Sequence, residues 1–428
     1  MDADPPRNDR PDDRAGSPRL RATAARLAAS PEVPAEVRGT ILRELDVLDR
    51  APASRATQDS VRYLTTLVGL PWEAPAEGWR DLEHVSRVLD HEVRRHAGAH
   101  DARDRFVSHA ALRGYRRRPG TTRRQDGYLE AVFSGPDALR PGDLDHVRRS
   151  VSRFRRTLAG RGSAPNGAPM LLVGPPGVGK TRIAERMADA AGTGFAKIGL
   201  AGSHDATALR GFARSWSGAG PSRIASALGR AGRRDAVLLL DEVDKLCEGS
   251  WQGAPAEVLL ELLDGRSEFR DDYLDLPLPL DEVCWIATAN DVSRIPGHLL
   301  DRLDVVHVDG YLPQEREMLV VETLWPQALV DAGVVPAPRS TGGVGGADRL
   351  VLTPAAARLL SAGAGTRDTG GLRETERRLW RLVAQLTHRA PDLLDEILDD
   401  PHRPALVLDL EAVLVYLPEL ARHRPDGV

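Results

Sequence analysis

The stretch Met170–Thr181, MLLVGPPGVGKT, decides the fold of this chain. A short apolar strand leads into a glycine-rich turn, and the residues from Arg182 onward have the pattern of a helix. The alternative is a glycine-rich turn with an incidental lysine, but a strand before the turn and a helix after it favour a phosphate loop. The turn has the spacing G-x-x-x-x-G-K-[ST], which is met by Gly174, Gly179, Lys180 and Thr181.

Each residue type in this turn has a role in binding phosphate. The glycines let several backbone N–H groups point at phosphate oxygens, and the helix N-terminus adds further donors. Lys180 brings a positive charge to the β- and γ-phosphates, and the hydroxyl of Thr181 can ligate Mg²⁺. We therefore predict that the chain binds a nucleoside triphosphate through Gly174, Pro175, Pro176, Gly177, Val178, Gly179, Lys180 and Thr181.

Composition sets limits on the class of protein. The length of 428 residues predicts two or three domains, and the net charge of −4 is too small to imply a polyanionic partner by itself. The 58 basic residues include only three lysines, Lys180, Lys197 and Lys245. Cys247 and Cys284 form no disulfide framework, which favours buried free thiols in a reducing compartment. Without a signal sequence or an apolar span, we expect a cytoplasmic protein that does not enter the membrane.

The N-terminal part of the chain is predicted to be helical. Residues 1–18 are rich in Pro, Asp and Arg and are expected to form a disordered tail. Residues 19–100 form an N-terminal helical segment, with breaks near Pro31 and Pro34 and with helices over 59–70 and 81–96.

Residues 101–140 contain a run of arginines with few acidic and few apolar residues. We favour a solvated, flexible Arg-rich insertion, and a nucleic-acid contact is the alternative. His96 and His100 have helical spacing but no carboxylate partner fixed beside them, which argues against a metal site.

Strand–helix alternation follows the phosphate loop and predicts a parallel sheet with helices on both faces. The buried strand Ala236–Leu240 ends in Asp241 and Glu242. Asp241 suits a Mg²⁺ partner through water, and Glu242 suits the base that orients the attacking water. Another strand ends near Asn290, whose amide is able to bond the γ-phosphate and that water. On chemistry alone the Asn290 signal is weak, because Asn is common at strand ends.

An ordered series of motifs resembles the AAA+ ATPase module of the Lon protease family, from about Asp143 to the C-terminus. Upstream, YLTTLVGLPWEAP and DLEHVSRVLD resemble the helical segment that precedes this module. The series reads GPPGVGKT, ALRGFARSWSGAGPSRI, LLLDEVDK, WQGAPAEVLLELLD, DDYLDLPL, IATAN, IPGHLLDRLDVVHVDGY and GGLRETERRL.

The resemblance implies an α/β AAA+ P-loop fold with a parallel five-stranded sheet over 141–312 and a helical lid over 313–428. It also implies a ring of identical subunits, usually a hexamer, and assigns roles by position. Asn290 would be the sensor at the γ-phosphate, Arg302 the arginine finger that reaches a neighbour's nucleotide, and Arg373 the lid's sensor arginine. Arginines are frequent here, so either arginine could instead form a surface ion pair.

Trp216 and Trp251 stand where the family has pore-loop aromatics that grip a polypeptide. Their glycine-rich flanks favour exposed loops over the alternative of two buried tryptophans. The chain departs from the family at Ser217 and Ala254, and alignment of Arg373 needs an insertion at Gly370–Gly371. No lysine follows Lys245, so the family's Ser–Lys protease site is not encoded in the rest of this sequence.

The sequence thus predicts a Lon-like AAA+ ATPase without its own protease site, which uses ATP and Mg²⁺ to remodel or unfold a protein substrate. Three alternatives stay open. The chain could be the motor subunit of a separate peptidase, a nucleic-acid-associated ATPase, or a nucleotide-gated scaffold with little turnover.

Overall fold

The structure is a computed structural model that describes residues 18–50, 55–116, 169–201, 206–216, 218–246, 254–264, 268–336, 347–362, 372–400 and 404–423. The chain divides into two compact units, each described by itself. Unit 1 comprises Met1–Val85, Phe106–Leu171 and Ala184–Val305, and unit 2 comprises Ser86–Arg105, Leu172–Ile183 and Val306–Val428. The domain boundaries expected at residues 140 and 312 stay a prediction.

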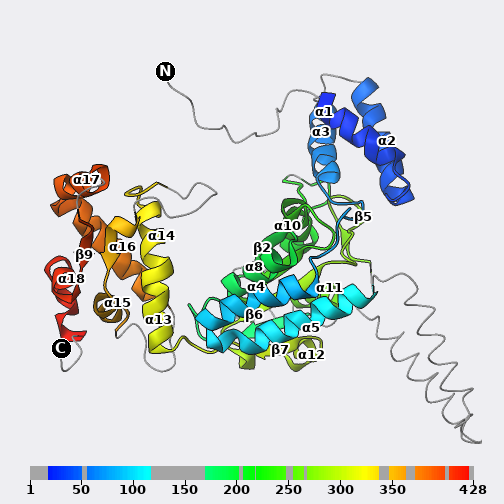
Figure 1. The fold of residues 1–428 in the computed structure, drawn as a ribbon. Coiled ribbons are helices and arrows are strands. Elements are labelled where there is room, and N and C mark those ends of the chain that lie inside the picture. Colours follow the sequence, from blue (N-terminus) through cyan, green and yellow to red (C-terminus); the bar gives the residue numbers. More distant parts are fainter. Residues whose placement is uncertain are drawn as a thin grey trace, which may run out of the picture. The chain divides into compact units, whose positions relative to one another are not determined.

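Three N-terminal helices pack together in unit 1 (Figure 1). They are α1 (Pro18–Ala29), α2 (Ala35–Arg50) and α3 (Arg55–Val68), and the break between α1 and α2 contains Pro31 and Pro34, as predicted. Their apolar faces are buried at helical spacing, for example through Val37, Ile41 and Leu48 of α2.

A five-stranded sheet with the order β2-β3-β6-β1-β7 confirms the predicted α/β P-loop architecture. Adjacent strands β2, β3 and β6 run parallel, and Leu240 of β3 lies opposite Ala287 of β6. Residues 237–240 of β3 form a continuous apolar run and β6 is apolar except for Thr288, because both faces of these strands are buried. The strands are β1 (Met170–Val173), β2 (Phe195–Gly199), β3 (Val237–Asp241), β6 (Cys284–Ala289) and β7 (Asp304–His307).

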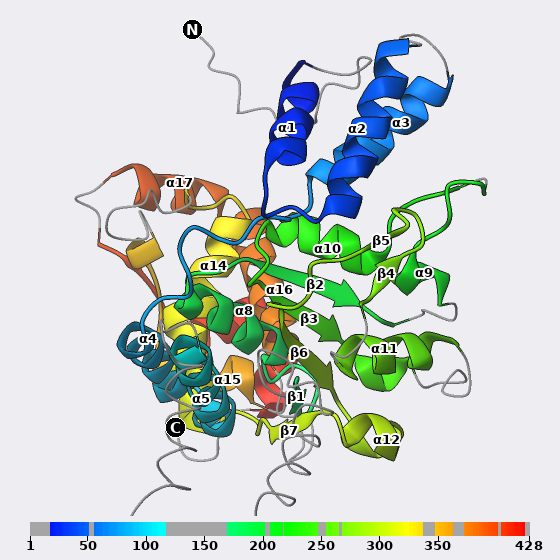
Figure 2. The same cartoon turned by 90° about the vertical axis from the view of Figure 1, so that its right-hand side faces the viewer.

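Helices and short elements connect these strands. In unit 1, α10 packs along β2 (Figure 2). Its first turn is capped by the Ser222 hydroxyl, which accepts the Ala225 N–H at 2.9 Å. The connecting elements are α8 (Lys180–Ala191), α9 (Thr207–Arg210), α10 (Arg223–Ala231), the 3₁₀ turns Val243–Lys245 and Val292–Arg294, α11 (Ala254–Asp264), the hairpin β4 (Arg270–Asp271) and β5 (Leu276–Pro277), and α12 (Gly297–Leu300).

The Arg-rich stretch begins with a packed helix and not with a solvated, flexible segment. After α4 (Leu82–Arg95) and a 3₁₀ turn (Ala97–Ala99), α5 runs from His100 to Arg116. Within unit 1, Phe106 is fully buried and stacks on Trp79 with ring centroids 5.3 Å apart. The prediction of a solvated insertion is therefore wrong for residues 101–116, because a few well-spaced apolar side chains suffice to bury one helix face. Residues 117–140 lie outside the described part of the chain.

Unit 2 contains the helical lid that the sequence predicts (Figure 1). Trp325 is its central side chain, buried to 2% exposure, with its indole N–H donated to the Leu350 carbonyl at 2.6 Å. Leu329, Leu360, Leu382 and Val413 pack in the same core. The lid consists of α13 (Pro313–Leu319), the π-helix Val320–Leu324, α14 (Trp325–Asp331), the 3₁₀ turn Ala347–Arg349, β8 (Leu350–Leu352), α15 (Pro354–Ser361), α16 (Arg373–Arg389), α17 (Pro391–Asp399), β9 (Leu406–Leu408), α18 (Leu410–Tyr416) and the 3₁₀ helix Pro418–His423.

No helix in the described residues is long and apolar enough to cross a lipid bilayer.

Candidate nucleotide site

The phosphate loop lies in unit 2 and holds its own lysine in place. Lys180 is only 8% exposed, and its ammonium donates to the carbonyls of Gly174 at 2.6 Å and Pro175 at 2.9 Å. Gly177 and Gly179 have φ angles of 81° and 84°, which side-chain-bearing residues rarely adopt. A Cβ at Gly174 would lie 2.1 Å from the Val308 carbonyl oxygen. The glycines are thus required by backbone geometry and close packing in this loop.

An aromatic pair supports the phosphate loop from the segment after β7. The rings of His96 and Tyr311 stack 4.0 Å apart, and His96 Nε2–H donates to the Asp309 carbonyl at 2.9 Å. A Cβ at Gly179 would lie 2.8 Å from the Tyr311 hydroxyl, so this tyrosine fits only against a glycine. Burial raises the pKa of Tyr311 to about 12, which keeps its hydroxyl neutral. Sequence reasoning treated His96 only as a poor metal ligand and missed this pair.

Stability is expected to fall as His96 takes up a proton. Burial lowers the pKa of His96 below its ordinary value, against smaller opposing effects of Asp309, Glu315 and Glu92. Because the folded-state pKa lies below the unfolded-state pKa of about 6.5, neutral His96 contributes stability at pH values above about 6.5. That stability is lost as the pH falls through the folded-state pKa. The melting temperature should therefore drop between about pH 7 and pH 5, and His96→Gln should flatten the drop.

The same substitution at His388, an exposed residue of α16, is the matched control. His388→Gln should leave the pH profile of the melting temperature unchanged. A His96→Gln profile as steep as that of the wild type would show that other groups cause the loss of stability.

The start of lid helix α16 contacts the phosphate loop within unit 2. The backbone N–H of Leu372 donates to the Gly177 carbonyl at 3.1 Å. Arg373, the candidate sensor arginine, is the next residue and begins α16. The structure therefore brings Arg373 to the edge of the predicted phosphate-binding loop.

The two carboxylates at the end of β3 lie in unit 1, where Thr288 connects them. The Thr288 hydroxyl donates to Asp241 Oδ1 at 2.7 Å and accepts the Glu242 backbone N–H at 2.9 Å. Glu242 has φ 60° and ψ 52°, a left-handed conformation that is rare for a residue with a side chain. Its strand-end turn is thus held by a hydroxyl from the neighbouring strand β6.

Lysines pair with both of these carboxylates. The Lys197 ammonium lies 2.5 Å from Asp241 Oδ2, and the Lys245 ammonium lies 2.8 Å from Glu242 Oε1. Neither pairing follows from the motif that identified the two acids. The sequence signal for these pairs was that lysine is scarce, so each lysine was a candidate for a specific role.

Asn290 is positioned by Asp244. The buried Asp244 carboxylate accepts the backbone N–H groups of Asn290 at 2.9 Å and Asp291 at 3.3 Å through Oδ2. Thr288 and Asp244 are site residues that sequence reasoning missed. A signal existed for Thr288, because it is a polar residue in the otherwise apolar strand Cys284–Ala289.

Arg302 lies between α12 and β7 in unit 1. Its guanidinium donates to the His298 carbonyl at 2.7 Å. Its assignment as an arginine finger stays a prediction.

Trp216 lies on an exposed loop, as predicted, with 70% of its surface accessible. The loop is closed by the antiparallel bridge between Phe212 and Gly220. The alternative of a buried Trp216 is wrong. Trp251 and Cys247 lie outside the described residues.

Cys284 is a buried free thiol, as predicted. Burial raises its pKa to about 12, so the thiol stays protonated and unreactive. Among the described residues no group of three or more His, Cys, Asp or Glu side chains forms a metal-binding cluster.

A family model for the ATPase family associated with various cellular activities (AAA) matches residues 170–309. This match covers the strands and the phosphate loop described above, so residues 170–309 are an AAA ATPase domain, which binds ATP. Over a longer span the chain is similar to Lon proteases, and its ATPase domain is related to theirs.

Two of these relatives have similar coverage. The Lon protease of Mycolicibacterium smegmatis is 33% identical over 389 residues, which cover 90% of this chain and 42% of that protein. The Lon protease of Salinispora arenicola (strain CNS-205) is 35% identical over 365 residues, which cover 85% of this chain and 40% of that protein. The chain therefore spans about two fifths of the length of these relatives. A solved structure of the Thermotoga maritima RuvB Holliday junction branch migration motor covers 64% of this chain and 68% of that chain, at 17% identity and a TM-score of 0.35.

Proposed function

We propose that this chain is an ATP-driven protein remodeller that works as a ring of identical subunits. The Lon family, which the sequence resembles, usually forms rings of six. In this proposal Lys180 and the loop backbone bind the phosphates, and Arg373 contacts them from the lid. Glu242 accepts a proton from the attacking water, and Asn290 orients that water. Arg302 serves the nucleotide of a neighbouring subunit.

The residues proposed to hold Mg²⁺ fit that ion. Asp241 supplies a carboxylate and Thr181 a hydroxyl, and Mg²⁺ commonly takes one or two protein oxygens, keeps several waters and binds phosphate oxygens for the rest. When bound, Mg²⁺ would neutralise charge on the phosphates. The Thr288 hydroxyl donates to Asp241 Oδ1 and so restricts rotation of this carboxylate.

The observation that carries the remodelling proposal is an exposed tryptophan on a firmly anchored loop. At the loop's base, the fully buried Asp271 carboxylate accepts the Ser222 N–H at 2.8 Å and the Tyr273 N–H at 2.9 Å. Arg214, two residues before Trp216, pairs with Glu44 of α2 and lies 4.2 Å over the ring of Tyr63. A large apolar side chain on such a base is suited to push on a polypeptide without reading its sequence.

Two arginines of α5 do not support the nucleic-acid alternative. Arg103 pairs with Asp90 at 2.7 Å, and Arg113 is 4% exposed and pairs with Glu282 at 3.1 Å. In the described part of the Arg-rich run, these two guanidinium groups are therefore engaged by carboxylates.

Trp216→Ala should abolish ATP-dependent unfolding of a protein substrate while ATP hydrolysis persists. The variant removes the exposed aromatic surface and leaves the ion pair of Arg214 and the groups assigned to the nucleotide in place. Unfolding is measured as loss of fluorescence from a tagged fluorescent protein, and hydrolysis as phosphate release. We expect no cleavage by the chain itself, and addition of a separate peptidase tests the motor-subunit alternative.

Trp380→Ala is the matched control, because Trp380 is an exposed tryptophan, 46% accessible, on lid helix α16. This variant should unfold the substrate at the wild-type rate. Normal unfolding by Trp216→Ala would contradict the remodelling proposal, and phosphate release stimulated by DNA but not by unfolded protein would favour the nucleic-acid alternative.

A further inference from the structure

All three lysines of the chain lie at groups assigned to the nucleotide. Lys180 is in the phosphate loop, Lys197 pairs with Asp241, and Lys245 pairs with Glu242. All the remaining basic side chains, out of 58 in the sequence, are arginines. A lysine ammonium is a compact charge on a flexible stem, whereas the arginine guanidinium is a planar fork that grips a carboxylate with two bonds. Lysine is thus the cation that a competing ion displaces more readily.

Strand register explains how Lys197 reaches Asp241. In the parallel pair of β2 and β3, Gly199 lies opposite Asp241, and Lys197 lies two residues earlier on the same face of β2. Gly199 has no side chain, and a Cβ placed there would meet no atom within 4 Å. The Lys197 side chain therefore extends diagonally past Gly199 to the carboxylate.

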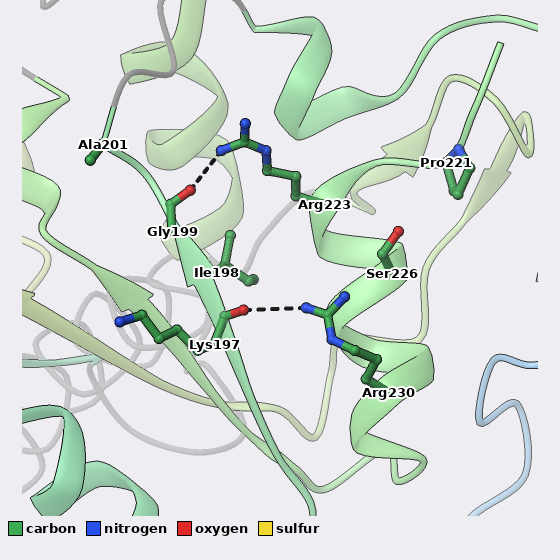
Figure 3. Close-up of a pocket in the computed structure, with 8 residues that line it drawn as sticks. All are labelled: Lys197, Ile198, Gly199, Ala201, Pro221, Arg223, Ser226 and Arg230. Carbon is green, nitrogen blue, oxygen red and sulfur yellow. Dashed lines mark hydrogen bonds between the residues drawn. The ribbon is translucent and has the colours of Figure 1, made fainter. Parts of the chain in front are cut away.

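The neighbouring cations of β2 and α10 are engaged differently (Figure 3). Arg223 donates to the Gly199 carbonyl at 2.7 Å, and Arg230 donates to the Lys197 carbonyl at 3.3 Å. In Figure 3 the Lys197 side chain extends away from both guanidinium groups. Together with Ser226 these residues line a pocket of about 520 Å³. Lys197 is the cation of this pocket that forms the ion pair with Asp241 described above.

The ion pair places a positive charge where a divalent cation is expected. Lys197 lies on Oδ2 of Asp241 while Thr288 donates to Oδ1, so each carboxylate oxygen already has a partner. A metal ion that approaches Asp241, directly or through a bound water, meets a neutralised carboxylate and a like charge. A metal ion held by Asp241 would therefore compete with the Lys197 ammonium, whose side chain is 48% exposed.

We propose that Lys197 is a positioning residue that holds Asp241 in an ion pair until a metal-bound nucleotide displaces it, so that it weakens metal binding by the resting site. This inference rests on the proposed nucleotide site. In this proposal the Lys197 ammonium of β2 competes with the metal ion for Asp241. The site would therefore bind metal and nucleotide together more readily than metal alone.

The test measures Mn²⁺ binding to the nucleotide-free full chain, with free Mn²⁺ read by electron paramagnetic resonance, and ADP binding in a separate titration. Lys197→Gln should tighten Mn²⁺ binding about two- to fivefold, the range expected for loss of a partly exposed ion pair. Lys197→Arg should bind Mn²⁺ no more tightly than the wild type, because the charge is kept. Thermal unfolding, followed in parallel, separates this effect from a change in stability.

Two controls isolate the contact with Asp241. Arg230→Gln removes a cation from the same pocket that bonds a backbone carbonyl, and it should leave Mn²⁺ affinity unchanged. In an Asp241→Asn background, Lys197→Gln should have no effect on Mn²⁺ affinity, because the partner of the lysine is already neutral.

The outcomes are distinguishable. Unchanged Mn²⁺ affinity in Lys197→Gln, an equal gain in Arg230→Gln, or a gain that persists in the Asp241→Asn background would each overturn the role given to Lys197. Failure of the wild-type chain to bind ADP at all would instead overturn the proposed nucleotide site, and this inference with it.

Discussion

Glu242→Gln is expected to bind ATP as tightly as the wild-type chain and to hydrolyse it about 10²- to 10⁴-fold more slowly. The amide has the shape of the carboxylate but accepts no proton from the attacking water. The local backbone should survive the change, because the Glu242 N–H that bonds Thr288 belongs to the main chain. The side chain is 25% exposed and its pair with Lys245 joins neighbouring residues, so the loss of that pair should affect stability little.

Equilibrium binding of a fluorescent ATP analogue and single-turnover phosphate release measure the two quantities separately. Lys180→Ala is the contrasting variant, since it removes the buried ammonium of the phosphate loop and should lose most of the nucleotide affinity. Near-normal turnover by Glu242→Gln would remove Glu242 from the role of base. Equal ATP binding by Lys180→Ala and the wild type would rule out the assigned phosphate site.

Features set by neighbouring residues in the sequence could be predicted. The phosphate loop is one, because its spacing requires glycine at Gly179, where the structure has a φ angle of 84°. The strand Val237–Asp241 is another, since an uninterrupted apolar run that ends in two acids indicates a buried strand of a parallel sheet. The alternation of such strands with helices was sufficient for the fold class.

Contacts between strands could not be predicted in the same way. The pair of Lys197 and Asp241 depends on the register that sets Gly199 opposite Asp241, and the bridge from Thr288 depends on the register of β3 with β6. No local pattern encodes either register. The left-handed conformation of Glu242 was equally hidden, because it is held by a hydroxyl that lies 46 residues away in the sequence.

Composition misled the prediction for α5. Arginines cluster in and after this helix, yet Phe106 is fully buried and the Arg113 guanidinium lies 4.6 Å over the ring of Trp79. A guanidinium can be buried when an aromatic face and a carboxylate receive it. Both partners of Arg113, Trp79 and Glu282, are distant in sequence, so counting charges along the run gave no sign of them.

Arg302→Ala is expected to leave ATP binding intact and to slow hydrolysis on the order of 10³-fold, as for loss of an arginine finger. The reason is that the proposed finger stabilises charge that develops on the phosphates during transfer. Arg294→Ala is the matched control from the preceding loop, because Arg294 is exposed and pairs with Asp291, three residues before it. Its removal should leave phosphate release near the wild-type rate.

Mixing two inactive variants tests whether Arg302 acts on a neighbour. In a mixed ring, an Arg302→Ala subunit keeps a sound Glu242, and an adjacent Glu242→Gln subunit supplies the missing arginine. Phosphate release should therefore recover in part on mixing, although each variant alone is nearly inactive. A finger that acted within its own subunit would give no recovery, since every subunit would still lack one of the two groups. Absence of recovery while labelled subunits demonstrably exchange would show that Arg302 does not act on a neighbour's nucleotide.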